Sequence, residues 1–136
     1  MKTRYSLDFS PAAPVLPVLI RLPGSIESKR LEGKVDSGAD MCAIPEDVIA
    51  DLDLPPVRMV RAAGFAGVLQ EVMLYHCAIE LADRRFEHVE AVATRRRYAI
   101  IGRNVLRHLV LKLDGPNTTL TIGAAKSRLT RRSRKA

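Results

Sequence analysis

Hydrophobic and polar residues alternate along much of the chain with a period of two, which is the pattern of strands with one buried face. In one example, Leu31, Gly33 and Val35 alternate with charged residues. A short helix is expected where Pro45 and two acidic residues precede an apolar segment. Strands are expected at residues 5–9, 15–22, 31–35, 42–44, 57–62, 68–81, 84–93, 109–113 and 118–122. The pattern predicts an all-β domain of six or more short strands.

The chain length of 136 residues fits one domain with one hydrophobic core. We assign residues 1–123 to this domain and residues 124–136 to a basic tail. Six of the formal +7 charges lie in the tail, which contains no acidic residue, so the remaining domain carries about +1. A basic terminus without aromatic residues is usually disordered and solvated. The alternative is weak, salt-sensitive contact with nucleic acid or an anionic surface.

Metal and cofactor chemistry finds little support in the sequence. Cys42, Cys77, His76, His88 and His108 show no spacing typical of a zinc site. The chain has no glycine-rich phosphate loop and no serine nucleophile elbow, so we expect no metal and no cofactor. Two cysteines without a secretory signal predict reduced thiols and a cytoplasmic location. No apolar stretch is long enough to span a membrane.

The first candidate site lies where a predicted strand ends at Val35 and delivers Asp36 into a turn. Ser37 can hydrogen-bond locally, and Gly38 allows another backbone to approach closely. This local geometry presents the Asp36 carboxylate rather than hiding it. The tripeptide alone does not establish a site, because ordinary turns at strand ends favour the same three residue types.

A second segment, residues 99–106, changes this interpretation: Ile100-Ile101-Gly102 is followed by Arg103-Asn104 and an apolar pair. Residues 36–40, Asp-Ser-Gly-Ala-Asp, resemble the active-site loop of retroviral-type aspartic proteases (retropepsins), and residues 99–106 resemble the second signature of that family. The signatures occur in the family's order, at a separation close to what one retropepsin domain needs. The resemblance implies a closed, barrel-like β domain with one short C-terminal helix that begins near Asn104.

The same resemblance implies an aspartic endopeptidase that acts without a cofactor. In this family a water molecule is activated between two aspartates, and this chain has a single Asp-Ser-Gly sequence. The resemblance therefore implies a two-fold homodimer in which each subunit supplies Asp36 and a polypeptide is the substrate. Peptide hydrolysis needs both a base and an acid, and two adjacent carboxylates that share one proton provide both, as is known for aspartic proteases.

The resemblance also implies roles for residues around Asp36. Ser37 would help to hold the two carboxylates coplanar. Gly38 would offer its backbone carbonyl to the substrate, with Ala39 and Asp40 beside it. Asp40 would pair with Arg103, which would support the active-site loop.

Retropepsins carry a flap, which is a β-hairpin that closes over the bound peptide. Gly64, Phe65, Ala66 and Gly67 lie at the corresponding place between two predicted strands. Two glycines around an apolar residue allow a turn with positive φ and a mobile lid. An ordinary hairpin turn has the same composition, and this segment has fewer glycines than viral flaps.

Two hypotheses of different class remain open. One is an active homodimeric endopeptidase; the other is a catalytically silent, retropepsin-like module for dimerisation or peptide binding. The joint presence of Asp36, Ser37 and Gly38 favours the enzyme, because a binding module has no chemical need for the carboxylate. A nucleic-acid binder that acts through the basic tail is a weaker third hypothesis. The basic run at residues 95–97 is expected on an exposed turn, or at the mouth of a cleft, where it would favour acidic substrates.

Overall fold

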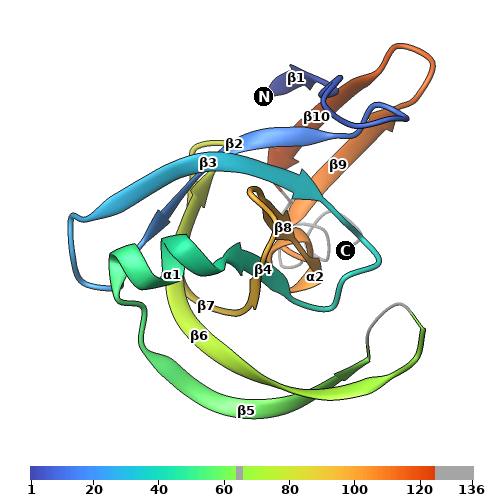
Figure 1. Ribbon diagram of the computed structural model, residues 1–136. Coiled ribbons are helices and arrows are strands. Elements are labelled where there is room, and N and C mark those ends of the chain that lie inside the picture. Colours follow the sequence, from blue (N-terminus) through green and yellow to red (C-terminus); the bar gives the residue numbers. More distant parts are fainter. Residues whose placement is uncertain (64–65, 125–136) are drawn as a thin grey trace, which may run out of the picture.

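The computed structural model describes residues 1–63 and 66–124 of the chain, and six of its strands form a closed barrel (Figure 1). The order around the barrel is β2 (Val15–Arg21), β3 (Ser28–Val35), β8 (Ala99–Ile101), β4 (Cys42–Pro45), β7 (Arg84–Thr94) and β6 (Leu69–Leu81). Antiparallel pairing of β6 with β2 closes the ring. The predicted all-β, barrel-like fold is therefore confirmed.

Alternate side chains of the strands fill the barrel. On β2, Leu16, Val18 and Ile20 point inward and are at most 2% exposed. Gly33 on β3 is buried beside them, and a Cβ atom at this position would lie 2.9 Å from side-chain carbons of both Val18 and Ile101. A side chain at this position would force these two core side chains to move. Each fully buried aliphatic side chain contributes roughly 1.5–3 kcal/mol to stability.

Two short helices accompany the strands. Helix α1 (Glu46–Leu52) begins after Pro45, as predicted, with acidic residues in its first turn. It ends at Asp53, which has the left-handed conformation with φ of 51°. Helix α2 (Arg103–Leu106) is a single turn that follows β8 and buries Val105 and Leu106 in the core.

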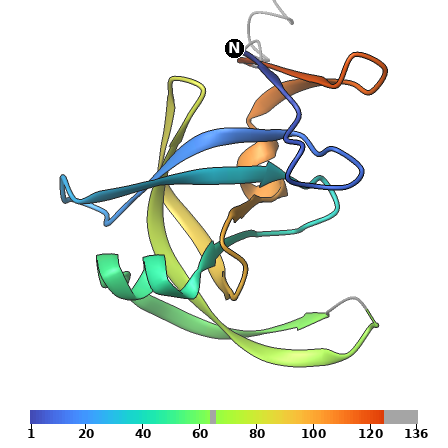
Figure 2. The same cartoon turned by 45° about the horizontal axis from the view of Figure 1, so that its top comes forward.

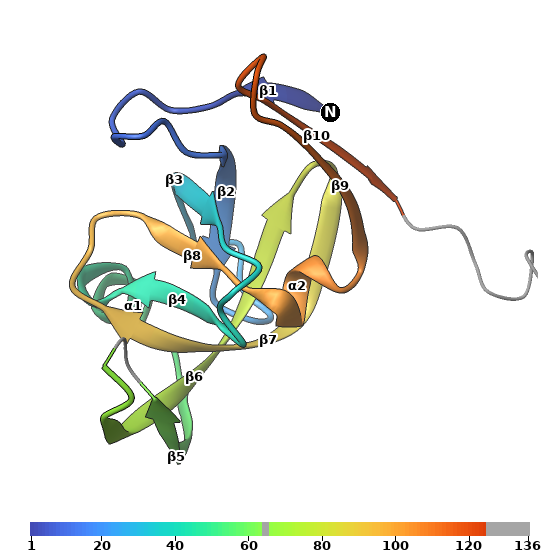
Figure 3. The same cartoon turned by 90° about the vertical axis from the view of Figure 1, so that its right-hand side faces the viewer.

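A separate three-stranded sheet joins the two ends of the described chain. It contains β1 (Lys2–Arg4), β10 (Thr119–Ala124) and β9 (Leu109–Asp114), with β10 in the centre. Figure 3 shows this sheet at the opposite end of the molecule from the β5–β6 hairpin. The last strand reaches one residue beyond the predicted domain boundary, and the rest of the predicted basic tail, residues 125–136, lies outside the described residues.

The predicted strand at residues 5–9 is wrong. Its only bridge in the described structure joins Ser6 to Ala13, and Leu7 is 88% exposed. The prolines at positions 11 and 14 have no N–H to donate, so a ladder cannot continue through the segment that would pair with these residues. Phe9 instead packs its ring edge-on against Tyr98.

Strand β5 (Pro56–Ala63) pairs with the first half of β6 to form a hairpin at the position predicted for the flap. Figures 1 and 2 show that this hairpin extends away from the barrel, and that β6 runs without interruption from the hairpin into the barrel wall. Gly67 has a φ of 73°, a conformation that favours glycine. Of the other predicted tip residues, Ala66 is exposed, whereas Gly64 and Phe65 lie outside the described residues.

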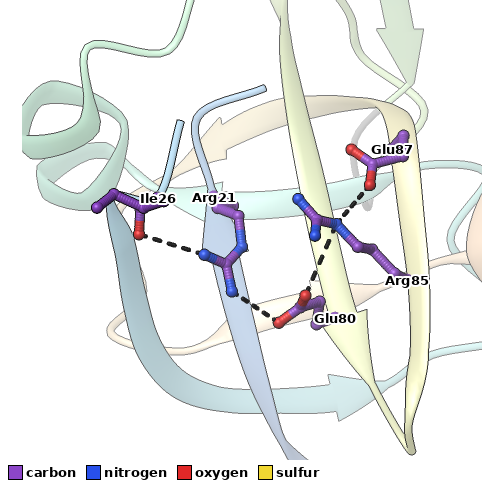
Figure 4. Close-up of polar contacts among 5 residues, drawn as sticks. All are labelled: Arg21, Ile26, Glu80, Arg85 and Glu87. Atoms are coloured by element: carbon purple, nitrogen blue, oxygen red, sulfur yellow. Dashed lines mark hydrogen bonds and ion pairs between the residues drawn. The ribbon is translucent and has the colours of Figure 1, made fainter. Parts of the chain in front are cut away.

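A network of charged side chains reinforces the place where the barrel closes (Figure 4). Glu80 on β6 lies 2.9 Å from Nη2 of Arg21 on β2 and 3.7 Å from Nε of Arg85 on β7. Strands β2 and β6 pair at only three positions, so these side chains add contacts where the ladder is short. Arg21 also donates to the backbone carbonyl of Ile26 at 3.2 Å. Across residues 1–63 and 66–124, no helix is long and apolar enough to cross a membrane.

The two buried cysteines predict a loss of stability in alkaline solution. Burial raises the pKa of the Cys42 thiol to about 11 and that of the Cys77 thiol to about 12, against 9.0 for an exposed cysteine. The unfolded chain therefore loses these protons first as the pH rises above 9. Stability is full below pH 9 and should fall by about 1 kcal/mol per cysteine for each pH unit above it, until the folded thiols ionise.

Urea denaturation between pH 7 and pH 10 measures this loss. Tyrosine and lysine residues also titrate in this range, so the control is the Cys42→Ala, Cys77→Ala double variant. We expect a weaker alkaline loss in the double variant than in the natural protein. Parallel pH profiles for the two proteins would contradict the prediction.

Candidate active site

The position of Asp36 follows from the arrangement of three strands. Strand β8 lies between β3 and β4, so the chain that leaves β3 must pass around the end of β8 before it enters β4 (Figure 3). Asp36 is the first residue after β3, and its N–H donates to the carbonyl of Ile101 at 3.1 Å. This bond extends the parallel β3–β8 pairing by one position and fixes where the loop of residues 36–41 begins.

The loop turns tightly around the Asp36 side chain. Oδ1 of Asp36 accepts the N–H of Gly38 at 2.9 Å, and the backbone carbonyl of Asp36 accepts the N–H of Ala39 at 3.2 Å. A Cβ atom on Gly38 would lie 3.2 Å from Oδ1, so a side chain there would crowd the carboxylate. Asp36 is half-buried and Ser37 is exposed. One carboxylate oxygen is thereby oriented, and Oδ2 has no hydrogen-bond partner among the described residues.

Arg103, the first residue of α2, holds this loop at three points. Its N–H donates to the carbonyl of Ala39 at 2.9 Å, and its Nη1 donates to the carbonyl of Ser37 at 2.9 Å. Its Nη2 forms an ion pair with Oδ1 of Asp40, as the sequence predicts. The side chains of Arg103 and Asp40 are 55% and 82% exposed, so the pair contributes at most about 1 kcal/mol to stability. Its main effect is to position the loop.

Gly102 permits α2 to begin close to the loop. A Cβ atom at this position would lie 2.5 Å from the backbone carbon and oxygen of Met41, and 3.0 Å from the carbonyl oxygen of Ala39. The φ of Gly102 is −94°, which any residue can adopt. Glycine is therefore required here because of the close approach and not because of the backbone conformation.

Behind the loop, Asn104 joins two strands through a side chain that is half-buried. Its Oδ1 accepts the N–H of Cys42 at 3.0 Å and lies 3.2 Å from the Cys42 thiol, while its Nδ2 donates to the carbonyl of Glu90 at 2.9 Å. The Cys42 thiol in turn accepts the N–H of Gly102 at 3.4 Å. Burial raises the pKa of this thiol, and the Gly102 N–H opposes that rise, so the thiol stays protonated and can donate to Asn104.

Sequence reasoning placed Asn104 only at the start of a helix and missed this bridging role. The signal in the sequence was Asn104 itself, a polar amide next to an apolar pair. A buried amide needs hydrogen-bond partners, so a bridging role could have been expected. The structure brings together Asp36, Ser37, Gly38, Ala39 and Asp40 with the arginine of the second signature. No hydrogen bond among the described residues connects this loop with the flap residues Ala66 and Gly67.

One chain therefore presents one carboxylate on a braced, solvent-accessible loop. Asp40, the other acidic residue of this loop, is already paired with Arg103. Nε2 of His76 lies 3.2 Å from Nδ1 of His88. Nevertheless, the described part of the chain contains no group of three or more His, Cys, Asp or Glu residues arranged to hold a metal ion.

Comparisons with known proteins agree with this arrangement. Residues 22–124, about three quarters of the chain, match a family model described as aspartyl protease. A search among curated proteins gives no significant match.

Among solved structures, a retropepsin-like aspartic protease from Rickettsia conorii is 11% identical with a TM-score of 0.59, and the alignment covers 90% of this chain and 88% of that one. EIAV protease, in complex with an inhibitor, is 21% identical with a TM-score of 0.52. The alignment covers 77% of this chain and 92% of that one. The foamy viral protease-reverse transcriptase, in complex with an RNA/DNA hybrid, is 17% identical with a TM-score of 0.55. That alignment covers 90% of this chain but only 14% of the longer protein. These similarities establish a retropepsin-like fold.

The contact at Gly102 predicts the effect of a single added methyl group. Gly102→Ala should lower the free energy of unfolding by about 1–3 kcal/mol, because the Cβ atom would overlap backbone atoms that cannot rotate away. Gly115→Ala is the matched control, since a Cβ atom there would have no neighbour within 4 Å. Urea denaturation of both variants measures the difference. Equal losses at the two positions would show that the loop tolerates the added group.

Proposed function

Because the chain belongs to the aspartyl protease family and has a retropepsin-like fold, we propose that it is an endopeptidase whose catalytic carboxylates are the two Asp36 side chains of a homodimer. The observation that supports this proposal most directly is the geometry of Asp36. The residue leaves β3 on a braced loop, with one carboxylate oxygen held by the Gly38 N–H and the other without a partner among the described residues.

The reaction requires that two carboxylates act in opposite protonation states. The ionised Asp36 accepts a proton from water, and the water oxygen forms a bond to the carbonyl carbon of the peptide. The protonated Asp36 of the partner subunit donates its proton to the carbonyl oxygen. Breakdown of the tetrahedral intermediate then breaks the C–N bond as a carboxylic acid proton passes to the leaving amine. Two carboxylates that share one proton are the known arrangement in aspartic proteases.

The homodimer is proposed because a single chain supplies half of this arrangement. The sequence contains one Asp-Ser-Gly. Ser37 is exposed, and its hydroxyl has no hydrogen-bond partner among the described residues, so it is available to the loop of a second subunit. A two-fold axis beside Asp36 would bring the two loops together, with the same residues in each.

The hairpin of β5 and β6 is proposed to cover an extended polypeptide. Met73, Tyr75 and Cys77 occupy alternate positions of β6 and therefore share one face, and Cys77 belongs to the barrel core. The register places Met59 opposite Met73, so the same face continues onto β5. Met59 and Leu69 are 52% and 65% exposed. This face is not wholly apolar, since it also carries Glu71 opposite Arg61. Its apolar side chains would contact those of a substrate.

Two further proposals, on the cellular compartment and on the role of the basic tail, rest only on the sequence and on the two thiols. Cys42 and Cys77 are free and buried, which supports a reducing, cytoplasmic environment. The proposed weak contact of the basic tail with nucleic acid or an anionic surface rests on composition alone.

Replacement of the proposed catalytic group gives the first test. Asp36→Asn keeps the size of the side chain and the acceptor for the Gly38 N–H but removes the base, so we expect peptide cleavage to fall by at least about 100-fold. Asp53→Asn is the control, because Asn is tolerated in the left-handed conformation at the end of α1. Mass spectrometry of a peptide library between about pH 3 and pH 7 gives the readout.

Equal cleavage by the natural protein and Asp36→Asn would exclude Asp36 as the catalytic group. If a folded dimer of the natural protein binds peptides but cleaves none, the silent binding module is the correct alternative.

The dimer requirement gives a second test, because each active site needs two chains. When the protein is diluted below its dimer dissociation constant, the cleavage rate should fall with about the square of the chain concentration. Sedimentation at the same concentrations measures the monomer fraction. An excess of Asp36→Asn chains should also inhibit the natural protein by forming mixed dimers. Constant activity per chain in a fully monomeric sample would overturn the proposal.

A further inference from the structure

Lys34, on β3, projects on the same side as Glu32 of that strand and as Asp36, the first residue after it. Side chains alternate across a strand, and Val35, which lies between Lys34 and Asp36, points into the core and is 8% exposed. Lys34 and Asp36 therefore project on the opposite side, and two strand residues span about 7 Å. The register of the parallel β3–β8 pair places Ile100 beside Lys34, so Ile100 continues this face onto β8, and Tyr98 lies just before that strand.

An aromatic ring, and not a carboxylate, accompanies the Lys34 ammonium group. Its Nζ lies 4.8 Å from the centre of the Phe9 ring, which is a cation–π distance. Phe9 contacts Tyr98 edge-on, with ring centres 4.9 Å apart. Lys34 forms no ion pair with any residue in the described part of the chain, although seven such pairs involve other residues there. Its positive charge is therefore available to a ligand.

A surface cavity of about 580 Å³ adjoins the same aromatic pair. Its lining includes the Phe9 and Tyr98 rings, the bases Arg96 and Arg97, and the acids Asp8 and Glu32. This volume is within the range of ligand sites. Lys34 does not line this cavity itself, but its ammonium group lies over the Phe9 ring, which does. Arg95, the remaining member of the basic run, instead lies 3.8 Å from Glu46 of α1.

We propose that Lys34 and the Phe9–Tyr98 pair form a subsite that binds an acidic side chain of the peptide substrate, and that Lys34 determines this specificity. The inference rests on the proposed function, because it places the subsite beside the reacting carboxylate. A substrate carboxylate would form a charge-assisted hydrogen bond with the ammonium group, whereas a basic side chain would be repelled. The apolar side chains of the β5–β6 hairpin and this charged subsite would thus contact different side chains of one peptide.

Paired peptides that differ only in Glu, Gln or Lys at one position test the inference. The position is moved through the three residues on each side of the cleaved bond. At one position we expect kcat/KM to be about tenfold higher for Glu than for Lys, a ratio that corresponds to about 1.4 kcal/mol. Lys34→Met should abolish the preference, Lys34→Arg should retain it, and Lys34→Glu should reverse it. Lys112→Met, on β9 of the terminal sheet, is the control for loss of a lysine.

The same peptides, labelled with a fluorophore, are also titrated into Asp36→Asn and Asp36→Asn, Lys34→Met proteins, with anisotropy as the readout. This arm separates the two proposals. Binding that prefers Glu only when Lys34 is present supports the subsite even if no protein cleaves any peptide, an outcome that overturns the proposed enzyme. Asp36-dependent cleavage with an unchanged Glu-to-Lys ratio in a folded Lys34→Met protein overturns the subsite and leaves the enzyme intact. Absence of any Glu preference in binding and in cleavage also overturns the subsite.

Discussion

The close approach of Gly102 to the backbone of Met41 is the constraint on which the site depends. Strand β8 ends there between β3 and β4, and the loop that carries Asp36 must pass around it. Only a residue without a side chain lets the next residues start α2 against that loop. Because α2 starts at this point, Arg103 reaches the outer side of the loop while Asn104 reaches the strands behind it. The absence of a side chain at Gly102 therefore allows Arg103 and Asn104 to take the positions from which they hold the loop.

These two braces differ in energetic character. The Arg103–Asp40 pair is exposed to water, so it orients the loop at little gain or cost in stability. The bridge from Asn104 to Cys42 and Glu90 is partly buried, and a buried polar group that loses its partner costs about 1–3 kcal/mol. The loop is thus anchored firmly on the core side and held more loosely on the solvent side. This division would suit the role proposed for Asp36, whose carboxylate would have to keep its position and still accept water and substrate.

Much of the fold was predictable because it depends on local patterns. The alternation in β3, the apolar run in β2, the mixed charged and apolar pattern in β7, and the proline and acids before α1 each predict the element that the structure contains. The same alternation failed at residues 5–9, where partner prolines prevent a ladder. At the candidate site, the motifs predicted that Asp36 would be presented on a turn after a strand and that Asp40 would pair with Arg103, and the structure contains both features. The close approach at Gly102, the Asn104 bridge and the position of Lys34 beside Ile100 were not predictable, since each depends on contacts between segments about 60 residues apart.

The length of strand β6 links two parts of the molecule mechanically. Its 13 residues would span about 43 Å if straight, and they form one side of the flap hairpin at one end and part of the barrel wall at the other. The hairpin and the wall therefore share one continuous strand, which pairs with β7 within the wall. Displacement of the hairpin would therefore be transmitted along β6 to the wall, where Glu80 pairs with Arg21 and Arg85 near the other end of the strand. The position of the β5–β6 hairpin and the shape of the barrel are thus coupled through this strand.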